Sequence, residues 1–489
     1  MTVRQRWIAG AVIAALAAGL APARAGAGAA DDIRALRREI EELRRRDRER
    51  RREIEALEVE VQRLRTVGSA PQPAASPSPL PAATALDRAV GALATAPGAA
   101  AAPGTSTTLA VRQIGSAEIK LLDVSLDLMV AAGGATVPDG EIGELQGGDH
   151  DPKRRGFTLQ QAELSFAGTV DPYFTAEAHL VAQPDGVELE EAFFTSTALP
   201  WNLQLKGGYF LTEFGRINPT HPHAWDWIDQ PLVVTRMFGG EGLRSPGSRL
   251  AWLSPLPWFS EVQVGIQDAG EEHTTTSFMG DEAIGGRPVE KTATASMADL
   301  LYLARWKNAW NWSDALSTQI GLSGLFGPNA TGGAGRTYVY GTDVVWKWQP
   351  PDHFRGWPFV TWQAEVIGRD YHAAPYVDAA DPGASLPAAT LRDWGLYTQA
   401  LWGFRYQWAA GLRYEYAGGS GSGLGGRQND PRRDDRHRVA PLIVWQPSEY
   451  TRLRLQYDFD HAEFLPAKDA HGVWLGFEVL YGAHPAHQY

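Results

Sequence analysis

The fold is decided by stretches such as TRLRLQYDFD at residues 451–460, in which apolar and polar side chains alternate. The apolar positions are Leu453, Leu455, Tyr457 and Phe459, and every residue between them is charged or carries an amide. Successive side chains of a β-strand point to opposite faces. The alternation therefore predicts a strand with one apolar face and one polar face.

Segments with the same period-two pattern recur along the chain beyond residue 113, and we count about 16 of them. They cover residues 119–131, 157–170, 173–182, 187–198, 202–212, 246–254, 259–268, 297–308, 314–326, 335–349, 358–370, 392–403, 408–417, 436–446, 450–460 and 472–482. This series predicts an all-β body.

The connections between these segments alternate in length. Short ones, such as 171–172 and 447–448, alternate with long polar ones, such as 213–245 and 269–296, and the connection 183–186 is the exception. Short turns at one rim and long loops at the other are typical of outer-membrane barrels. We therefore predict an antiparallel transmembrane β-barrel of about 16 strands. A soluble β-sandwich would explain the alternation but not the difference between the rims.

Three segments of different composition precede the barrel. Residues 1–25 combine basic residues, a short apolar run and Ala-Arg-Ala, which is typical of a cleaved signal peptide. Residues 31–66 carry Ile, Leu and Val in heptad register between Arg and Glu, which predicts a helical coiled coil and hence oligomerisation. Residues 67–112 form a low-complexity Ala/Pro linker that we expect to be disordered. The barrel would then span residues 113–489.

Composition excludes several classes of function. The 489 residues include no cysteine, which excludes disulfides, thiolate nucleophiles and cysteine-ligated metal sites. The formal net charge of -12 argues against general nucleic-acid binding. Adjacent Glu190 and Glu191 should point to opposite faces of a strand, which makes them a poor acid–base pair. With no G-x-S-x-G, Walker A or H-E-x-x-H string, we expect no enzymatic activity and no cofactor.

These features together resemble the phosphate-selective porins of O and P type, including members with an N-terminal coiled coil. The resemblance rests on the order of the segments, on GGYFLTEFGR at residues 207–216, on the turn PSEY at residues 447–450, and on a closing strand that ends at Tyr489. It implies a trimeric barrel of about 16 strands that carries small anionic solutes. The positions expected to face the lumen mix acidic and basic residues, however. Because the body is acidic, we expect a weakly selective or cation-leaning channel.

The third long connection, which runs from strand to strand over residues 212–245, is the candidate pore constriction. This assignment follows from the resemblance and from strand counting. Its candidate residues are His221, His223, Asp226, Asp229, Arg236, Glu241 and Arg244. The His-x-His pair His221 and His223, with an aspartate nearby, is compatible with transition-metal binding. Hydrogen bonding of both imidazoles to the backbone or the rim is the alternative.

Charged residues on the polar faces of the strands are the candidate lumen-lining set. They are Glu163, Glu177, Lys206, Asp343, Lys347, Glu365, Arg413, Glu415, Arg452, Arg454, Asp458 and Glu478.

We therefore predict a porin of the bacterial outer membrane, a passive diffusion channel for small hydrophilic solutes or ions, with its coiled coil in the periplasm. The expected partners are the lipid bilayer, lipopolysaccharide, further copies of the chain in a homotrimer, and peptidoglycan, contacted through the coiled coil. Two other functions stay open. One is a receptor or transporter for a metal ion or a metal chelate, and the other is a coiled-coil tether of the cell envelope.

Overall fold

The computed structural model describes residues 108–482, apart from 115–116, 185, 272–273, 282–283, 379–380, 382–384, 422–429 and 431–432, and describes side chains from residue 122 onward. The predicted signal peptide, the predicted coiled coil and most of the predicted linker lie outside the described residues.

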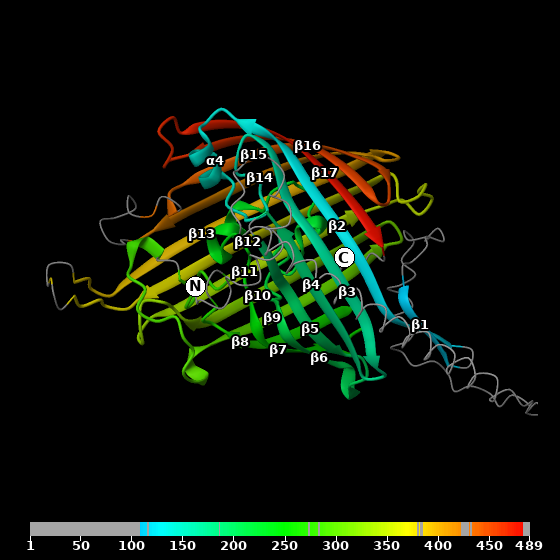
Figure 1. The fold of residues 1–489 in the computed structure, drawn as a ribbon, viewed down its shortest axis with the longest axis horizontal. Helices are drawn as coiled ribbons and strands as arrows, with labels where there is room; N and C mark the ends of the chain where they lie inside the picture. Colours follow the sequence, from blue (N-terminus) through cyan, green and yellow to red (C-terminus); the bar gives the residue numbers. More distant parts are fainter. Residues whose placement is uncertain are drawn as a thin grey trace, which may run out of the picture. The chain divides into compact units, whose positions relative to one another are not determined.

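Sixteen antiparallel strands, β2 to β17, form a closed barrel in which each strand pairs with its neighbours in the chain and β17 pairs with β2. Figure 1 shows this closure, with β2 in cyan beside β17 in red. The strands are β2 Ala117–Ala135, β3 Gly156–Asp171, β4 Phe174–Gln183, β5 Gly186–Ser196, β6 Leu203–Leu211, β7 Arg244–Leu253, β8 Phe259–Asp268, β9 Leu300–Ser313, β10 Leu316–Pro328, β11 Arg336–Trp348, β12 Phe359–Ala373, β13 Ala389–Arg405, β14 Trp408–Ser420, β15 Arg436–Ser448, β16 Thr451–Ala462 and β17 Asp469–Gly482.

The predicted all-β fold is confirmed, and every predicted segment falls on one of these strands. A further strand, β1 Thr108–Ile114, pairs with the beginning of β2. It was not predicted, and it crosses the boundary expected between linker and barrel.

The barrel is apolar on its outer face and polar on its inner face. In β16, Gln456 and Asp458 are buried, whereas Leu455 and Tyr457 between them are 50% and 38% exposed. This inverts the pattern of a water-soluble barrel, and an outward apolar band is the mark of a transmembrane β-barrel.

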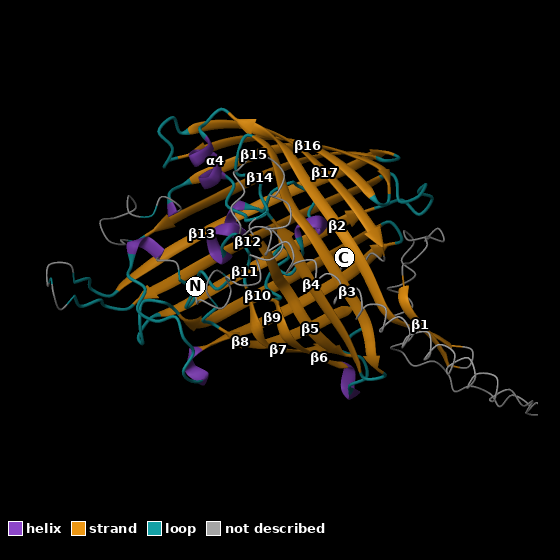
Figure 2. Ribbon diagram, viewed as in Figure 1, coloured by secondary structure: helices purple, strands orange, loops and turns teal. Residues whose placement is uncertain are grey.

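The two rims differ as the sequence predicts. Tight turns join β3 to β4, β9 to β10 and β13 to β14, whereas long connections follow β2, β6, β8 and β12. Figure 2 shows the helices as short pieces beside the long strands. They are α4 Asp139–Leu145, η2 Pro200–Asn202, η3 Pro222–Ala224, α5 Leu232–Phe238, η4 Ile284–Gly286 and η5 Met297–Asp299. Among the described residues, no helix has the length and apolarity needed to cross a membrane.

Candidate functional site

The connection between β6 and β7, residues 212–243, lies inside the barrel, and we call it the inward segment. It includes η3 and α5. Its large apolar side chains are buried, with Trp227 and Phe238 exposed by 1% and 0%. They contact the inner faces of strands far away in the chain, from β9 to β17. The inward segment therefore occupies part of the lumen.

One side of the inward segment is anchored by buried charges. Arg413 of β14 and Arg438 of β15 both form ion pairs with Asp229. Gln456 donates to Asp229 Oδ1 at 2.8 Å, and Arg454 donates to the carbonyls of Trp225 and Trp227 at 3.0 Å each. Burial by itself would raise the pKa of Asp229, but the two guanidinium groups outweigh it and lower that pKa.

The opposite side of the inward segment packs in an apolar core inside the barrel. Helix α5 lies against β12, β13 and β14. Phe214 and Phe238 meet edge to face with ring centroids 5.2 Å apart. The other buried members of this core are Ile217, Trp225, Val233, Val234, Met237, Leu243, Ala269, Phe278, Met279, Leu301, Leu303, Leu325, Val339, Ile367 and Tyr397. On this side, the inward segment and the wall are therefore joined by apolar contacts.

Glycines of the wall leave space for the aromatic rings of the inward segment. A Cβ atom at Gly411 would lie 2.9 Å from the ring of Trp227, and one at Gly341 would lie 2.9 Å from the ring of Phe214. The Trp227 indole also donates to the carbonyl of Ala440 at 2.9 Å. The ring positions therefore depend on the absence of side chains at these two wall positions.

A group of histidines and glutamates connects the inward segment to β3, β4 and β5, and we call it the His–Glu cluster. Its members are Glu163, His179, Glu190, Glu191, His221 and His223. Glu163 Oε2 lies 2.9 Å from His223 Nδ1 and 3.4 Å from His221 Nδ1, and Glu163 Oε1 lies 3.0 Å from His179 Nδ1. His221 lies between Glu190 Oε2, 2.9 Å from Nδ1, and Glu191 Oε2, 2.8 Å from Nε2.

The interpretation of Glu190 and Glu191 as residues on opposite faces is wrong. Both are buried and both contact His221. The pairing of β4 with β5 shifts register between His179 and Leu180, which marks a β-bulge. A bulge places an extra residue on one strand, so two successive side chains point to the same side.

Charge on the cluster favours protonated histidines. Burial by itself would lower the pKa of His221, but Glu190 and Glu163 outweigh it and hold that pKa well above its usual range. The pKa of His223 is raised in the same way, with Glu163 outweighing burial. The carboxylates therefore determine the protonation of both residues.

The remaining candidates of the predicted constriction lie in the inward segment itself, except Arg244, which begins β7. Glu241 and Arg244 pair with one another at 2.8 Å, and Arg244 also pairs with Glu188 of β5. Arg236 donates to the carbonyl of Asp434 at 2.9 Å. Asp226 is half-buried, and burial raises its pKa. The structure thus places His221, His223 and Asp229 in contact networks that cross the lumen, whereas their role as a constriction stays a prediction.

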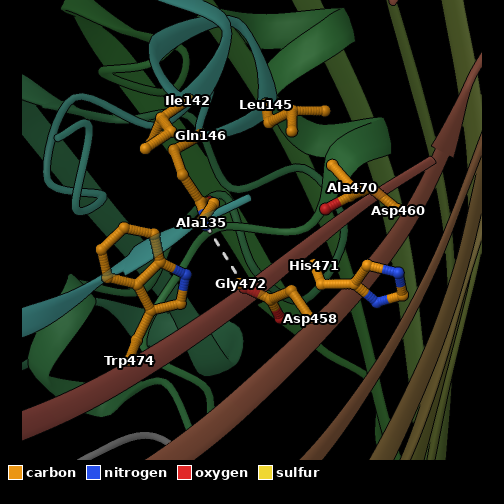
Figure 3. A pocket seen from close by; sticks show the side chains of 10 residues that line it. All are labelled: Ala135, Ile142, Leu145, Gln146, Asp458, Asp460, Ala470, His471, Gly472 and Trp474. Carbon is orange, nitrogen blue, oxygen red and sulfur yellow. Dashed lines mark hydrogen bonds between the residues drawn. The ribbon is translucent and has the colours of Figure 1, made fainter. Parts of the chain in front are cut away.

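The predicted lumen-lining residues all lie on the inner faces of strands. Seven are buried, and the side chain of Glu177 is 35% exposed. Most form ion pairs, such as Arg305 with Asp343 at 3.0 Å and Arg452 with Glu478. Asp458 contacts only uncharged partners, accepting from Gln146 at 3.3 Å and Gln456 at 2.8 Å. Figure 3 shows Asp458 in a small pocket lined also by Gln146 and Trp474.

Comparison with known proteins gives one relative in sequence and several in fold. No family model matches the sequence. An uncharacterized protein of Aquifex aeolicus (strain VF5) is 28% identical over 394 residues, which cover 76% of this chain and 80% of that protein.

Solved structures similar to the chain are outer-membrane proteins. The outer membrane channel DcaP of Acinetobacter baumannii is 13% identical with a TM-score of 0.46, covering 74% of this chain and 96% of that one. OmpT of Vibrio cholerae is 8% identical with a TM-score of 0.45, covering 76% and 100%. The anion-selective porin from Comamonas acidovorans is 9% identical with a TM-score of 0.42, covering 74% and 99%.

Proposed function

We propose that this protein is a porin-type channel of the bacterial outer membrane, in which small hydrophilic solutes or ions diffuse past the inward segment. The observation that carries the proposal is the position of this segment, which is fixed to the inner wall by Asp229, Arg413 and Arg438. A barrel of this size encloses a lumen wide enough for a channel, and an inward segment then sets the permitted size of solute.

The apolar and charged halves of the lumen differ in the side chains that line them. The inward segment packs against β9 to β13 through apolar side chains, and this packing leaves less room for a hydrated ion on that side. The charged half offers polar side chains along β2 to β5 and β14 to β17. Diffusion therefore follows the charged half.

An acidic surplus in the lumen favours cations. In the charged half, Asp127 has no hydrogen-bond partner for either carboxylate oxygen, and Asp458 accepts from the uncharged Gln146 and Gln456. Most other charges in the lumen are neutralised in pairs. Because such carboxylates attract cations whenever they are ionised, we propose a weakly selective or cation-leaning channel, and phosphate selectivity is not part of the proposal.

The proposed surroundings follow from the predicted segments. The barrel would lie among outer-membrane lipid and lipopolysaccharide, with residues 31–66 in the periplasm as a coiled coil. That coiled coil would hold three copies together and contact peptidoglycan. Crosslinking of the full chain in membranes measures the copy number.

The test is single-channel conductance in planar bilayers, with the reversal potential measured under a salt gradient. We expect stepwise conductance and a cation-leaning potential. Trp227→Ala removes a buried ring from the inward segment and should enlarge each step, whereas Trp402→Ala removes a ring that is 56% exposed on the outer face and should leave it unchanged. An inserted native barrel that does not conduct would overturn the proposal and favour the receptor or the tether. Equal steps in both variants would show that solutes do not pass the inward segment.

A further inference from the structure

We propose that the His–Glu cluster binds one divalent transition-metal ion of the zinc class, with His221, His223 and Glu163 as ligands. One donor atom from each of these residues lies within 4.8 Å of the other two. The three atoms are His221 Nδ1, His223 Nδ1 and Glu163 Oε2, which converge at 2.9 and 3.4 Å around the carboxylate oxygen. Zinc binds such donors at about 2.0–2.2 Å, so small movements of the side chains are enough to enclose an ion.

The Nε2 atom of His221, which would not bind the metal, already contacts a carboxylate, as is usual for histidine ligands of metals. It lies 2.8 Å from Glu191 Oε2, while Glu191 Oε1 accepts from the backbone N–H of Leu211 at 2.7 Å. A carboxylate that holds one imidazole nitrogen as a donor fixes the tautomer and directs the other nitrogen toward the metal. Glu191 is therefore a positioning residue.

The second oxygen of Glu163 is held in the same manner. Ser165 donates its hydroxyl to Glu163 Oε1 at 2.7 Å, and His179 Nδ1 lies 3.0 Å from the same oxygen. These contacts orient the carboxylate so that Oε2 is directed at His221 and His223. A carboxylate that is already held by hydrogen bonds loses less conformational entropy when it binds a metal ion.

An independent observation comes from Asp127 of β2. The residue is 4% exposed, and neither of its carboxylate oxygens has a hydrogen-bond partner. It lies directly across the β2–β3 ladder from Glu163, so the two carboxylates share the inner face. A buried carboxylate without a partner is costly unless a proton or a cation neutralises it. A metal ion beside Glu163 would supply that charge.

The donor set selects the class of metal. Imidazole nitrogen with carboxylate oxygen suits zinc, copper, nickel and iron, whereas calcium and magnesium prefer sites made of oxygen alone. At the edge of the cluster, the side chain of Glu177 is 35% exposed, and its Oε2 lies 4.0 Å from His179 Nε2. The proposed metal site does not depend on the proposed channel function. A chain that binds zinc but does not conduct would contradict the channel function and leave the metal site supported.

The test is a calorimetric titration of the chelator-treated, detergent-purified full chain with zinc. We expect one zinc ion per chain, and the double variant His221→Gln/His223→Gln should weaken binding by at least about 100-fold, because even outer-shell partners of metal ligands account for about 10- to 100-fold. His437→Gln is the matched control, since His437 is exposed and bonded to Tyr414. A native chain without zinc, or equal binding by the double variant, overturns the proposal.

A second measurement needs no variant. Copper(II) added to the native chain should give an electron paramagnetic resonance spectrum with coupling to imidazole nitrogens. A spectrum of bound copper without that coupling would overturn the assignment of His221 and His223, whether or not the double variant folds.

Discussion

The two halves of the lumen differ in how they hold the inward segment. In the apolar half, α5 and Phe214 bury hydrocarbon against β9 to β13. In the charged half, Asp229 and the His–Glu cluster connect the segment to β3, β5, β14 and β15 through ion pairs. Apolar packing does not depend on the protonation of any group, whereas buried ion pairs depend on both partners being charged. The inward segment is therefore held by apolar packing that does not change with protonation and by ion pairs that do.

The largest effect should come from breaking the charged half at its centre. Asp229→Asn leaves Arg413 and Arg438 buried without their shared carboxylate. Removing one partner of a buried ion pair costs up to about 3–5 kcal/mol when the remaining charge is uncompensated. Arg413 and Arg438 keep Glu415 and Asp460 as partners, so we expect a loss of up to that size in denaturant unfolding of the barrel in detergent micelles. Asp352→Asn in an exposed turn is the control and should change the free energy of unfolding by no more than about 0.5 kcal/mol. Equal effects would mean that Asp229 anchors nothing.

Acid should weaken a further charged contact of the inward segment, which lies next to the apolar half and joins the segment to β6 and β7. Burial would raise the pKa of Glu213, at the start of the inward segment, but Arg249 and Lys206 outweigh it and lower that pKa to about 2. A depressed carboxyl pKa stabilises the folded chain above the usual pKa, 4.5, and this contribution disappears as the pH falls through about 2. The advantage of the native chain over Glu213→Gln should thus shrink between these values, by up to about 3 kcal/mol. Denaturant unfolding of the native chain and of Glu213→Gln at pH 6 and pH 2 measures this difference in free energy of unfolding. A difference that stays constant would refute the stabilising ion pairs of Glu213 with Arg249 and Lys206.

Much of the barrel could be predicted from the sequence, because strand alternation is local. The outward Leu455 and Tyr457 and the inward Gln456 and Asp458 follow from period two alone. The long connection between β6 and β7 was also identifiable as special, from its length and its place in the strand order.

The His–Glu cluster could not be predicted, because its members come from separate places in the chain. His223 and Glu163 are 60 positions apart, and only the fold brings them together. The β-bulge that turns both Glu190 and Glu191 inward leaves no trace in the alternation, and it made the sequence-based interpretation wrong. A signal that was available is the presence of glycines such as Gly341 and Gly411 at inner-face positions, where a ring from elsewhere needs space.

The apolar half can be tested at one such glycine, where the smallest effect is expected. In Gly341→Ala the new methyl group would lie 2.9 Å from the ring of Phe214, which must then move within a close-packed core. Overpacking of this kind costs about 1–3 kcal/mol. Gly324→Ala is the matched control, since a Cβ atom there meets no other atom within 4 Å. The difference between the two variants in denaturant unfolding should be the same at pH 6 and pH 2, because no ionisable group takes part. If this difference in unfolding free energy disappeared at pH 2, the packing around Phe214 would depend on the charged contacts. The apolar and charged attachments of the inward segment would then not be independent.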